Sequence, residues 1–282
     1  AADGRPFFLS VGFFDPHHPF DPIEPYASMF KPEDMPPPLM REGEEQGMTP
    51  PARKKFDAYA DVRETPGQLA GVAAGYHATV AHVDAMVGRI LAALKATGLE
   101  ERTVVVFTSD HGEMLGDHGI LHKGPLFYEG AVHVPLIWRF PQALGVRGVD
   151  AEFVSHVDFA PTVAALAGID GPALMQGRPL FDAEGTLRPA GAPAAALTEW
   201  RESEPQKPGP YAVARCLRTD RWKLVHYHGQ DFGELYDLER DPGEFENLWA
   251  QPEHRETRAA REAELLAFQI ETEPCPLRTD LF

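Results

Sequence analysis

The feature that most constrains the fold is a helical stripe followed at once by a strand-sized apolar run. Apolar residues recur at three- and four-residue steps between residues 76 and 94, the period of one helix face. Gly98 follows as a helix stop signal, and the run at 103–107 (TVVVF) has the length of a buried strand. A helix that leads directly into a buried strand is typical of α/β proteins.

Other segments extend this alternation. The Phe-rich run at residues 6–14 and the run at 134–138 are both strand-sized, and residues 159–166 predict a short helix. Residues 21–53 hold many prolines and predict an irregular surface excursion. Strands separated by helices predict an α/β fold with a mostly parallel sheet sandwiched by helices.

The pattern changes after about residue 193. Residues 211–228 predict two strands joined by a turn at residues 219–220, and residues 233–244 predict a third strand and a turn. Residues 253–272 predict a charged, amphipathic terminal helix. We therefore expect two parts: an α/β part at 1–192, and a smaller antiparallel subdomain with a helix at 193–282.

Composition excludes some classes of partner. The net charge of −17 disfavours nucleic acid and anionic membranes, because their phosphates would be repelled. No apolar run approaches the roughly 18 residues that a membrane span needs. Cys216 and Cys275 are isolated and form no CxxC pair, so a zinc knuckle is not indicated and the cellular compartment stays open.

Ligand-type residues follow two of the predicted strands. Asp15, His17 and His18 come after the first run, and Asp110 and His111 come after the run at 103–107. In open α/β sheets, ligands bind outside the carboxyl ends of the strands. Asp110 and His111 offer a carboxylate oxygen and an imidazole nitrogen, a pairing that suits a divalent cation. The simpler alternative is a turn-capping aspartate beside an exposed loop histidine.

The loop that begins with this pair, FTSDHGEMLGDHGILHK, holds further candidates. Gly112 leaves room for the backbone to approach a ligand. His118 and His122 have helical ligand spacing, but the glycines between and before them favour a loop, and no HExxH is present. Lys123 is either a solvated surface lysine or a point charge that binds the oxyanions of an anionic ester.

Two other groups have structural interpretations. Ser109, Asp110 and His111 spell out a hydrolase triad, but the side chains of adjacent residues diverge, so we reject that interpretation. Four basic residues alternate along the predicted C-terminal hairpin and predict its solvated face: Arg215, Arg218, Arg221 and Lys223.

Taken together, the segments resemble the sulfatase family of the alkaline phosphatase superfamily. PFFLSVGFFDPHHPF, TVVVFTSDHGEMLGDHGILHKGPLFYEGAVHVPLI, VSHVDFAPTVAALAG and LRTDRWKLVHY are similar to successive blocks of that family, in the family's order. The first two blocks look closest to iduronate sulfatase and related bacterial sulfatases. The resemblance implies an alkaline phosphatase-like α/β fold, the α/β part being the C-terminal portion of the sulfatase catalytic domain.

The resemblance also implies roles for five residues. Asp110 and His111 match the family's second pair of metal ligands, usually for Ca²⁺, with Mn²⁺ or Mg²⁺ as alternatives. Lys123 matches the lysine that contacts the sulfate, and His17 matches the histidine near the sulfate and the leaving-group oxygen. His118 matches a commonly present histidine, and we place it in the catalytic set without a specific role.

The ester type stays open. Many sulfatases have asparagine where this chain has His111, and histidine there is also found in phosphonate and phosphodiester hydrolases of the superfamily. The expected substrate is a small-molecule or carbohydrate sulfate ester. The alternative is a phosphonate monoester or phosphodiester.

The family's nucleophile segment has no match in this chain. The family uses C/S-x-P-x-R, in which the cysteine or serine becomes formylglycine, but neither Cys216 nor Cys275 has that context. The family's N-terminal Asp-Asp metal pair is also missing. The resemblance therefore implies a C-terminal portion whose formylglycine and remaining ligands lie in an absent N-terminal portion. A non-catalytic relative of the same fold is a further alternative.

Overall fold

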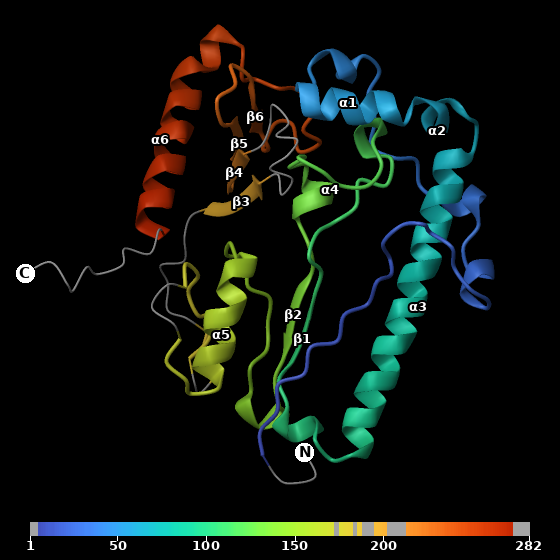
Figure 1. Ribbon diagram of the computed structural model, residues 1–282, viewed down its shortest axis with the longest axis vertical. Coiled ribbons are helices and arrows are strands. Elements are labelled where there is room, and N and C mark those ends of the chain that lie inside the picture. Colours follow the sequence, from blue (N-terminus) through green and yellow to red (C-terminus); the bar gives the residue numbers. More distant parts are fainter. Residues whose placement is uncertain (1–4, 172–174, 183–184, 188–194, 202–212, 273–282) are drawn as a thin grey trace, which may run out of the picture. The chain divides into compact units, whose positions relative to one another are not determined.

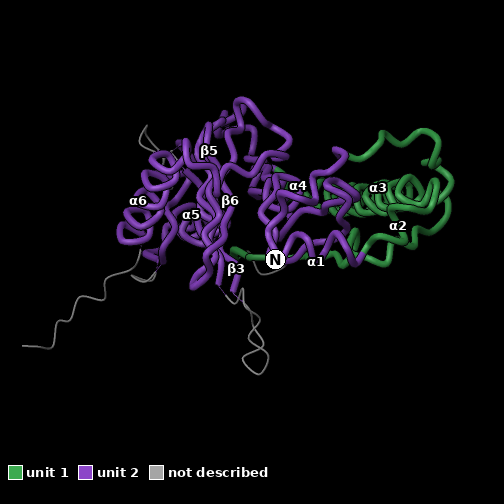
Figure 2. The backbone as a smooth tube through the Cα atoms, turned by 90° about the horizontal axis from the view of Figure 1, so that it is seen from above, with its two compact units in different colours: residues 1–38, 59–100 green, residues 39–58, 101–282 purple. Residues whose placement is uncertain are grey.

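The computed structural model describes residues 5–171, 175–182, 185–187, 195–201 and 213–272 (Figure 1). The chain forms two compact units (Figure 2): residues 1–38 with 59–100, and residues 39–58 with 101–282. The predicted boundary near residue 193 separates two parts of the second unit and stays a prediction.

The first unit is built on the predicted long helix. Helix α3 spans Gln68–Ala96 and follows the short helix α2, Ala60–Glu64. The helix begins earlier than the apolar stripe because Gly67, with φ +78°, turns the chain directly before it. At the other end Gly98 has a φ of +68°, and its amide donates to the Lys95 carbonyl. The predicted stop signal is therefore confirmed. Short 3₁₀ turns at Tyr26–Ser28 and Pro32–Asp34 precede these helices.

The run at residues 6–14 is not a strand. It is extended, but it pairs with no other strand in the described part of the chain. Its large side chains are exposed: Phe8 and Leu9 at 69% and Phe14 at 72%. Apolar composition favours an extended backbone, but a strand also needs a neighbour for its backbone N–H and C=O groups. The strand prediction was therefore wrong here.

The second unit contains the other two predicted strands. β1 (Val105–Thr108) pairs with β2 (Leu136–Arg139) in antiparallel register, with Val105 opposite Arg139. The mostly parallel sheet is not seen among the described strands of this chain. The connection between β1 and β2 is a long loop with one four-residue helix, α4 (Glu129–Val132), and not a crossover helix, so β2 runs back beside β1.

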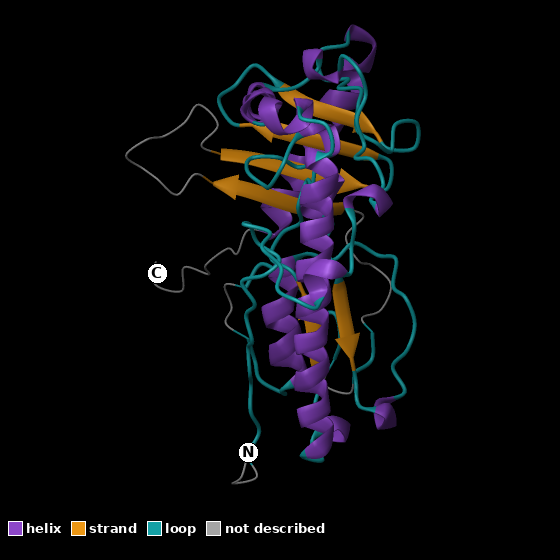
Figure 3. Ribbon diagram, turned by 90° about the vertical axis from the view of Figure 1, so that its right-hand side faces the viewer, coloured by secondary structure: helices purple, strands orange, loops and turns teal. Residues whose placement is uncertain are grey.

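The C-terminal part contains the predicted antiparallel sheet. Its strands are ordered β3 (Ala195–Arg201), β4 (Val213–Thr219), β5 (Trp222–Tyr227) and β6 (Gly233–Asp237), all antiparallel (Figure 3). β3 was not predicted. Leu217, Leu224 and Leu235 from the sheet share a core with Leu265 of the terminal helix α6, Arg255–Thr272.

The remaining elements are short. Helix α1 (Pro50–Ala58) begins at the end of the proline-rich segment that we expected to be irregular, and α5 (Phe159–Leu166) has the predicted bounds. Six 3₁₀ turns complete the described part: Glu44–Gln46, Glu100–Arg102, Asp117–Gly119, Gln142–Leu144, His156–Asp158 and Pro252–His254. None of the described helices is both long and apolar enough to cross a bilayer.

Candidate active site

Strand β1 delivers the two predicted metal ligands to the start of the loop. The Asp110 carboxylate accepts a hydrogen bond from the His111 amide at 3.0 Å and is otherwise open, with 86% of the side chain exposed. The other carboxylate oxygen lies 3.6 Å from His111 Nε2. The structure therefore brings the carboxylate and the imidazole together, as the sequence predicted.

The His111 ring is held in one tautomer. Its Nδ1 lies 2.8 Å from the Gly112 carbonyl oxygen, which can only accept, so Nδ1 carries the hydrogen. Nε2 then has a free electron pair, and the Lys123 ammonium lies 2.6 Å from it as the donor. A histidine that donates one ring N–H to a backbone carbonyl and presents the other nitrogen is a common arrangement of metal ligands.

Gly112 is required by the fold of the loop, and the predicted approach of its backbone to a ligand stays a prediction. Its amide donates to the Ala131 carbonyl of α4 at 2.8 Å. A Cβ at this position would lie 2.0 Å from the Gly130 carbonyl oxygen, a distance that no side chain tolerates. Gly112 is therefore the point at which the loop is anchored to α4.

The rest of the loop closes on itself around Glu113. The Glu113 carboxylate accepts hydrogen bonds from the Leu115 and His122 amides. Leu115, His118 and His122 all have positive φ, between +50° and +64°. Each such residue costs roughly 1–2 kcal/mol, and such costs concentrate at functional sites. The loop is thus strained near the two candidate ligands.

His118 is buried inside the second unit. Its side chain is 4% exposed, its Nδ1 lies 2.9 Å from the Glu44 carboxylate, and its ring stacks on Tyr128 at 4.1 Å. The His118 amide also donates to the Leu39 carbonyl at 2.7 Å. These contacts hold the middle of the loop against the segment before α1. A direct catalytic role for His118 stays a prediction.

His17 lies in the first unit, so its relation to Lys123 stays a prediction. Its Nδ1 is 2.8 Å from the His18 carbonyl oxygen, and its ring stacks on the His18 ring at 4.1 Å. Asp15, two residues earlier, lies 3.7 Å from His82 of α3. His17 is half-buried within this turn.

The Asp110–His111 pair does not make a complete metal site. Within the described residues, no group of three or more His, Cys, Asp or Glu side chains could hold a metal ion. A divalent cation such as Ca²⁺ usually takes about six to eight ligands. The pair would supply two of them.

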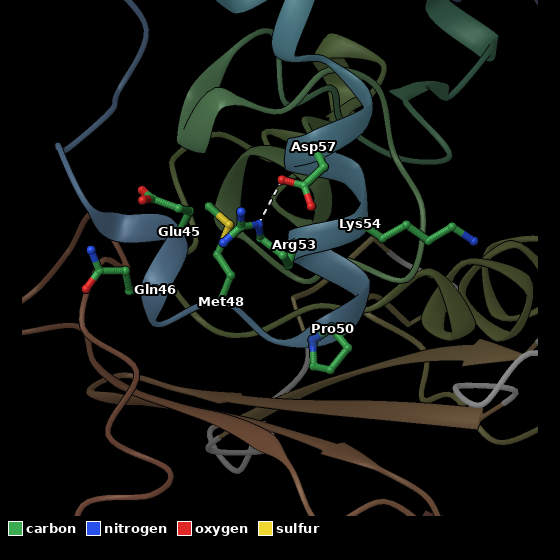
Figure 4. A pocket seen from close by; sticks show the side chains of 7 residues that line it. All are labelled: Glu45, Gln46, Met48, Pro50, Arg53, Lys54 and Asp57. Atoms are coloured by element: carbon green, nitrogen blue, oxygen red, sulfur yellow. Dashed lines mark hydrogen bonds and ion pairs between the residues drawn. The ribbon is translucent and has the colours of Figure 1, made fainter.

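A surface hollow of about 610 Å³ lies elsewhere (Figure 4). Glu45, Gln46, Met48 and Pro50 line one part of it, and Arg53, Lys54 and Asp57 of α1 line another. None of the candidate site residues lines it. Arg53 and Asp57 form an ion pair of 2.8 Å across it, which leaves little net charge to attract an ionic ligand.

The sequence analysis did not predict the charged cluster of Lys223, Glu129 and Glu244. Lys223 is fully buried, and its ammonium lies 2.6 Å from Glu129 of α4 and 2.5 Å from Glu244. The same ammonium donates to the Phe127 carbonyl at 2.8 Å. Burial by itself lowers the pKa of Lys223, but the charges of Glu244 and Glu129 outweigh it and raise the pKa. The predicted solvated face is therefore wrong for Lys223.

Cys216 is unsuited to nucleophilic catalysis. The thiol is fully buried in the C-terminal sheet, and that burial raises its pKa to about 12. The thiolate, which is the nucleophilic form, is then scarce at neutral pH. Cys275 lies outside the described residues.

The family model named Sulfatase matches residues 1–169, and the model named N-sulphoglucosamine sulphohydrolase, C-terminal, matches residues 116–271. The chain belongs to the sulfatase family. It therefore has the fold predicted from the resemblance, an alkaline phosphatase-like α/β fold with an antiparallel C-terminal sheet.

Two curated relatives agree with this assignment. The N-acetylglucosamine-6-O-sulfatase of Bacteroides thetaiotaomicron is 35% identical over 70% of the chain and 35% of that protein. The arylsulfatase of Clostridium perfringens is 31% identical over 89% of the chain and 51% of that protein. The chain thus spans about a third to a half of these relatives.

A solved structure is also similar. The phosphonate monoester hydrolase of Agrobacterium radiobacter superposes with a TM-score of 0.81 at 30% identity, covering 95% of this chain and 57% of that one. Sulfatases and a phosphonate monoester hydrolase therefore both lie among the relatives of this sulfatase-family chain.

Proposed function

We propose that this chain is the C-terminal portion of a metal-dependent hydrolase of sulfate esters. The observation that carries the proposal is the contact among Asp110, His111 and Lys123. A carboxylate, an imidazole Nε2 with a free electron pair and an ammonium meet at the end of β1. The sulfatase relatives support the choice of ester.

Asp110 and His111 would hold one side of a divalent cation. A bound cation polarises the oxygens of an anionic ester and favours attack at its central atom. The residues fit this role because the Gly112 carbonyl fixes the His111 tautomer with Nε2 available. We propose Ca²⁺ as the ion, with Mn²⁺ and Mg²⁺ as alternatives, because carboxylate oxygens suit all three.

Lys123 would bind the sulfate oxygens. Its ammonium now donates to His111 Nε2, and a cation at that nitrogen would displace it toward an anion. A fixed positive charge beside oxygens that gain negative charge lowers the barrier, by about 3–4 kcal/mol for a well-placed donor. His17 would bind the sulfate and the leaving-group oxygen, and His118 would position the loop.

The nucleophile would come from a segment outside this chain. Support comes from the share of the relatives that the chain spans, from the incomplete ligand pair and from the burial of Cys216. By family resemblance, the nucleophile would be a formylglycine. The proposed N-terminal portion would also bring the missing ligands.

A second candidate is the hydrolysis of phosphonate monoesters or phosphodiesters. It is favoured by His111 and by the similarity to the phosphonate monoester hydrolase. The same cation and ammonium would bind a phosphoryl group, because both esters present anionic oxygens in tetrahedral geometry.

Paired aryl substrates separate the two candidates. The full-length protein is assayed with 4-nitrophenyl sulfate and with a 4-nitrophenyl phosphodiester, before and after removal of metal with a chelator. We expect the higher kcat/KM on the sulfate, loss of activity with chelator, and recovery with Ca²⁺. A higher kcat/KM on the phosphodiester would establish the second candidate in its place.

A further inference from the structure

Helix α1 presents one face to the candidate site loop. Ala52 and Phe56, four residues apart, lie on that face: Ala52 is fully buried in a core with Met114 and Ile120 of the loop, and Phe56 packs against the same core. Lys55 lies between them at the i, i+3 position and shares the face. The packing of α1 therefore places Lys55 beside the loop.

The end of the Lys55 side chain occupies space left by Gly124. A Cβ on Gly124 would lie 3.0 Å from Lys55 Cε and 3.6 Å from its Nζ. Gly124 directly follows Lys123 and has φ +156°, which also disfavours a side chain. The Lys55 side chain of α1 thus lies against the loop residue that directly follows Lys123.

Lys55 makes no direct ion pair in the described part of the chain, and the opposing charge that acts on it is that of Glu113. Among the described residues its half-buried ammonium also makes no hydrogen bond, whereas Arg53 on the opposite face of α1 pairs with Asp57 (Figure 4). Burial lowers the pKa of Lys55, Glu113 opposes this, and the charges of Lys54 and Lys123 add to the lowering. Despite Glu113, the pKa of Lys55 stays lowered, so a further anion beside the ammonium would stabilise its charged form.

We propose that Lys55 binds a second anionic group of the substrate, a sulfate or carboxylate on the same sugar as the ester that is cleaved. Lys123 would bind the reacting sulfate, and Lys55, one loop position further on, would bind the additional charge. The preferred substrate class is then a polyanionic sulfated carbohydrate. The inference rests on the proposed function for the identity of the reacting ester.

A matched pair of sugars tests the inference. The full-length protein with Ca²⁺ is titrated calorimetrically with D-glucosamine 2-N,6-O-disulfate and with D-glucosamine 6-O-sulfate. We expect the disulfate to bind more tightly, and Lys55→Gln to weaken the disulfate by roughly ten-fold or more, as for loss of a charged hydrogen bond. Binding of the monosulfate should change by less than about two-fold in this variant.

Lys54→Gln is the control, because it removes the same charge from the exposed face of the same helix. It should leave both affinities unchanged. Equal affinity of the wild-type protein for the two sugars, or equal losses for the two sugars in Lys55→Gln, would overturn the inference.

The two proposals fail in different ways. A protein that prefers the disulfate through Lys55 but hydrolyses no sulfate ester refutes the proposed function and leaves the second anion site standing. A protein that hydrolyses aryl sulfate, and whose Lys55→Gln variant still discriminates between the two sugars, keeps the function and refutes the role of Lys55.

Discussion

The hydrogen bond from His111 Nδ1 to the Gly112 carbonyl decides which ring nitrogen is available for chemistry. With Nδ1 occupied, Nε2 is the only nitrogen that can accept from Lys123 or bind a cation. Asp110 reaches the same nitrogen at 3.6 Å. At the scale of single residues, the Asp110 carboxylate and the Lys123 ammonium therefore both lie near His111 Nε2. The Gly112 carbonyl determines that this nitrogen is the acceptor.

Replacing Lys123 by alanine in the full-length protein should lower kcat for an aryl sulfate by roughly 10²–10³-fold, as for loss of one donor to the transition state. The fold should survive, because the ammonium of Lys123 contacts His111 at the site and not an apolar core. The measurements are steady-state kinetics and a thermal melt, with Lys54→Ala as the control of equal charge. Wild-type turnover in Lys123→Ala would remove this residue from the mechanism.

Glu234 makes stability depend on pH. Its carboxylate is buried and accepts from Thr49 and Tyr227, and burial raises its pKa above the ordinary value of 4.5. A group with a raised folded pKa adds stability below its unfolded pKa and loses that contribution as pH rises through the folded pKa. Above the ordinary pKa of a glutamate, the burial of the Glu234 carboxyl therefore costs stability.

Glu234→Gln should accordingly raise the melting temperature at pH 8 by a few degrees relative to wild type, and should not raise it at pH 4. The amide oxygen can still accept from Thr49 and Tyr227. Thermal melts at the two pH values measure the effect, and the exposed Glu253→Gln serves as the control. A pH-independent shift would show that burial of the charge is not the cause.

At the scale of elements, one lysine joins the C-terminal sheet to the segment that follows the candidate site loop. Lys223 of β5 contacts Glu129 of α4, Glu244 beyond β6 and the Phe127 carbonyl. Glu244 in turn accepts from the Glu129 amide at 2.7 Å. The position of α4, on which Gly112 is anchored, therefore depends on the hairpin.

Lys223→Met should destabilise the protein by about 3–5 kcal/mol, because it leaves the buried Glu244 carboxylate without its counter-ion and leaves Glu129 with Arg218 alone. Denaturant unfolding measures the loss. The control is Arg240→Ala, whose side chain is 80% exposed and should contribute about 0.5 kcal/mol or less. If Lys223→Met lowers the free energy of unfolding as little as the control does, water must hydrate the carboxylates in place of the lysine.

The elements that the sequence predicted are those whose signals are local. Helix α3 follows from its apolar stripe, and the hairpin of β4 and β5 follows from its turn at residues 219–220. The strand at residues 6–14 failed because pairing depends on a second segment. Lys223 was placed on the wrong face because its partners lie 94 and 21 positions away in the chain, where no local pattern reaches.

The candidate site was predictable in kind but not in detail. Asp110 and His111 stood out as ligand types at a strand end, and the structure brings them together with Lys123. The His111 tautomer and the approach of Lys55 to Gly124 depend on contacts between separate segments. Sequence spacing does not encode such contacts.

At the scale of the whole molecule, three observations support the proposal that further residues complete the candidate site. Among the described residues no group of three or more candidate metal ligands occurs, so Asp110 and His111 stay a candidate pair, and the chain spans about a third to a half of its curated relatives. In addition, residues 6–14 expose several large apolar side chains. Exposed apolar surface of this kind marks an interaction site or an aggregation risk.

Residues 1–282 expressed alone should bind Ca²⁺ weakly, hydrolyse no sulfate ester and have low solubility. Two ligands from one loop leave most of the coordination to water, which reduces affinity. Calcium calorimetry and an aryl sulfate assay on the purified chain are the measurements. Calcium-dependent turnover by this chain alone would show that the nucleophile lies within it.

The ion cluster at Lys223 also bears on how sulfatases can be recombined. The C-terminal family model begins at residue 116, inside the candidate site loop, and overlaps the Sulfatase model, which ends at residue 169. In a chimera joined near residue 193, Lys223 would come from one parent and Glu129 and Phe127 from the other. The ion pair of Lys223 with Glu129 and its hydrogen bond to the Phe127 carbonyl would then depend on residues from two different proteins. Exchange of the C-terminal sheet between relatives should therefore succeed only when the donor also brings its own α4 segment.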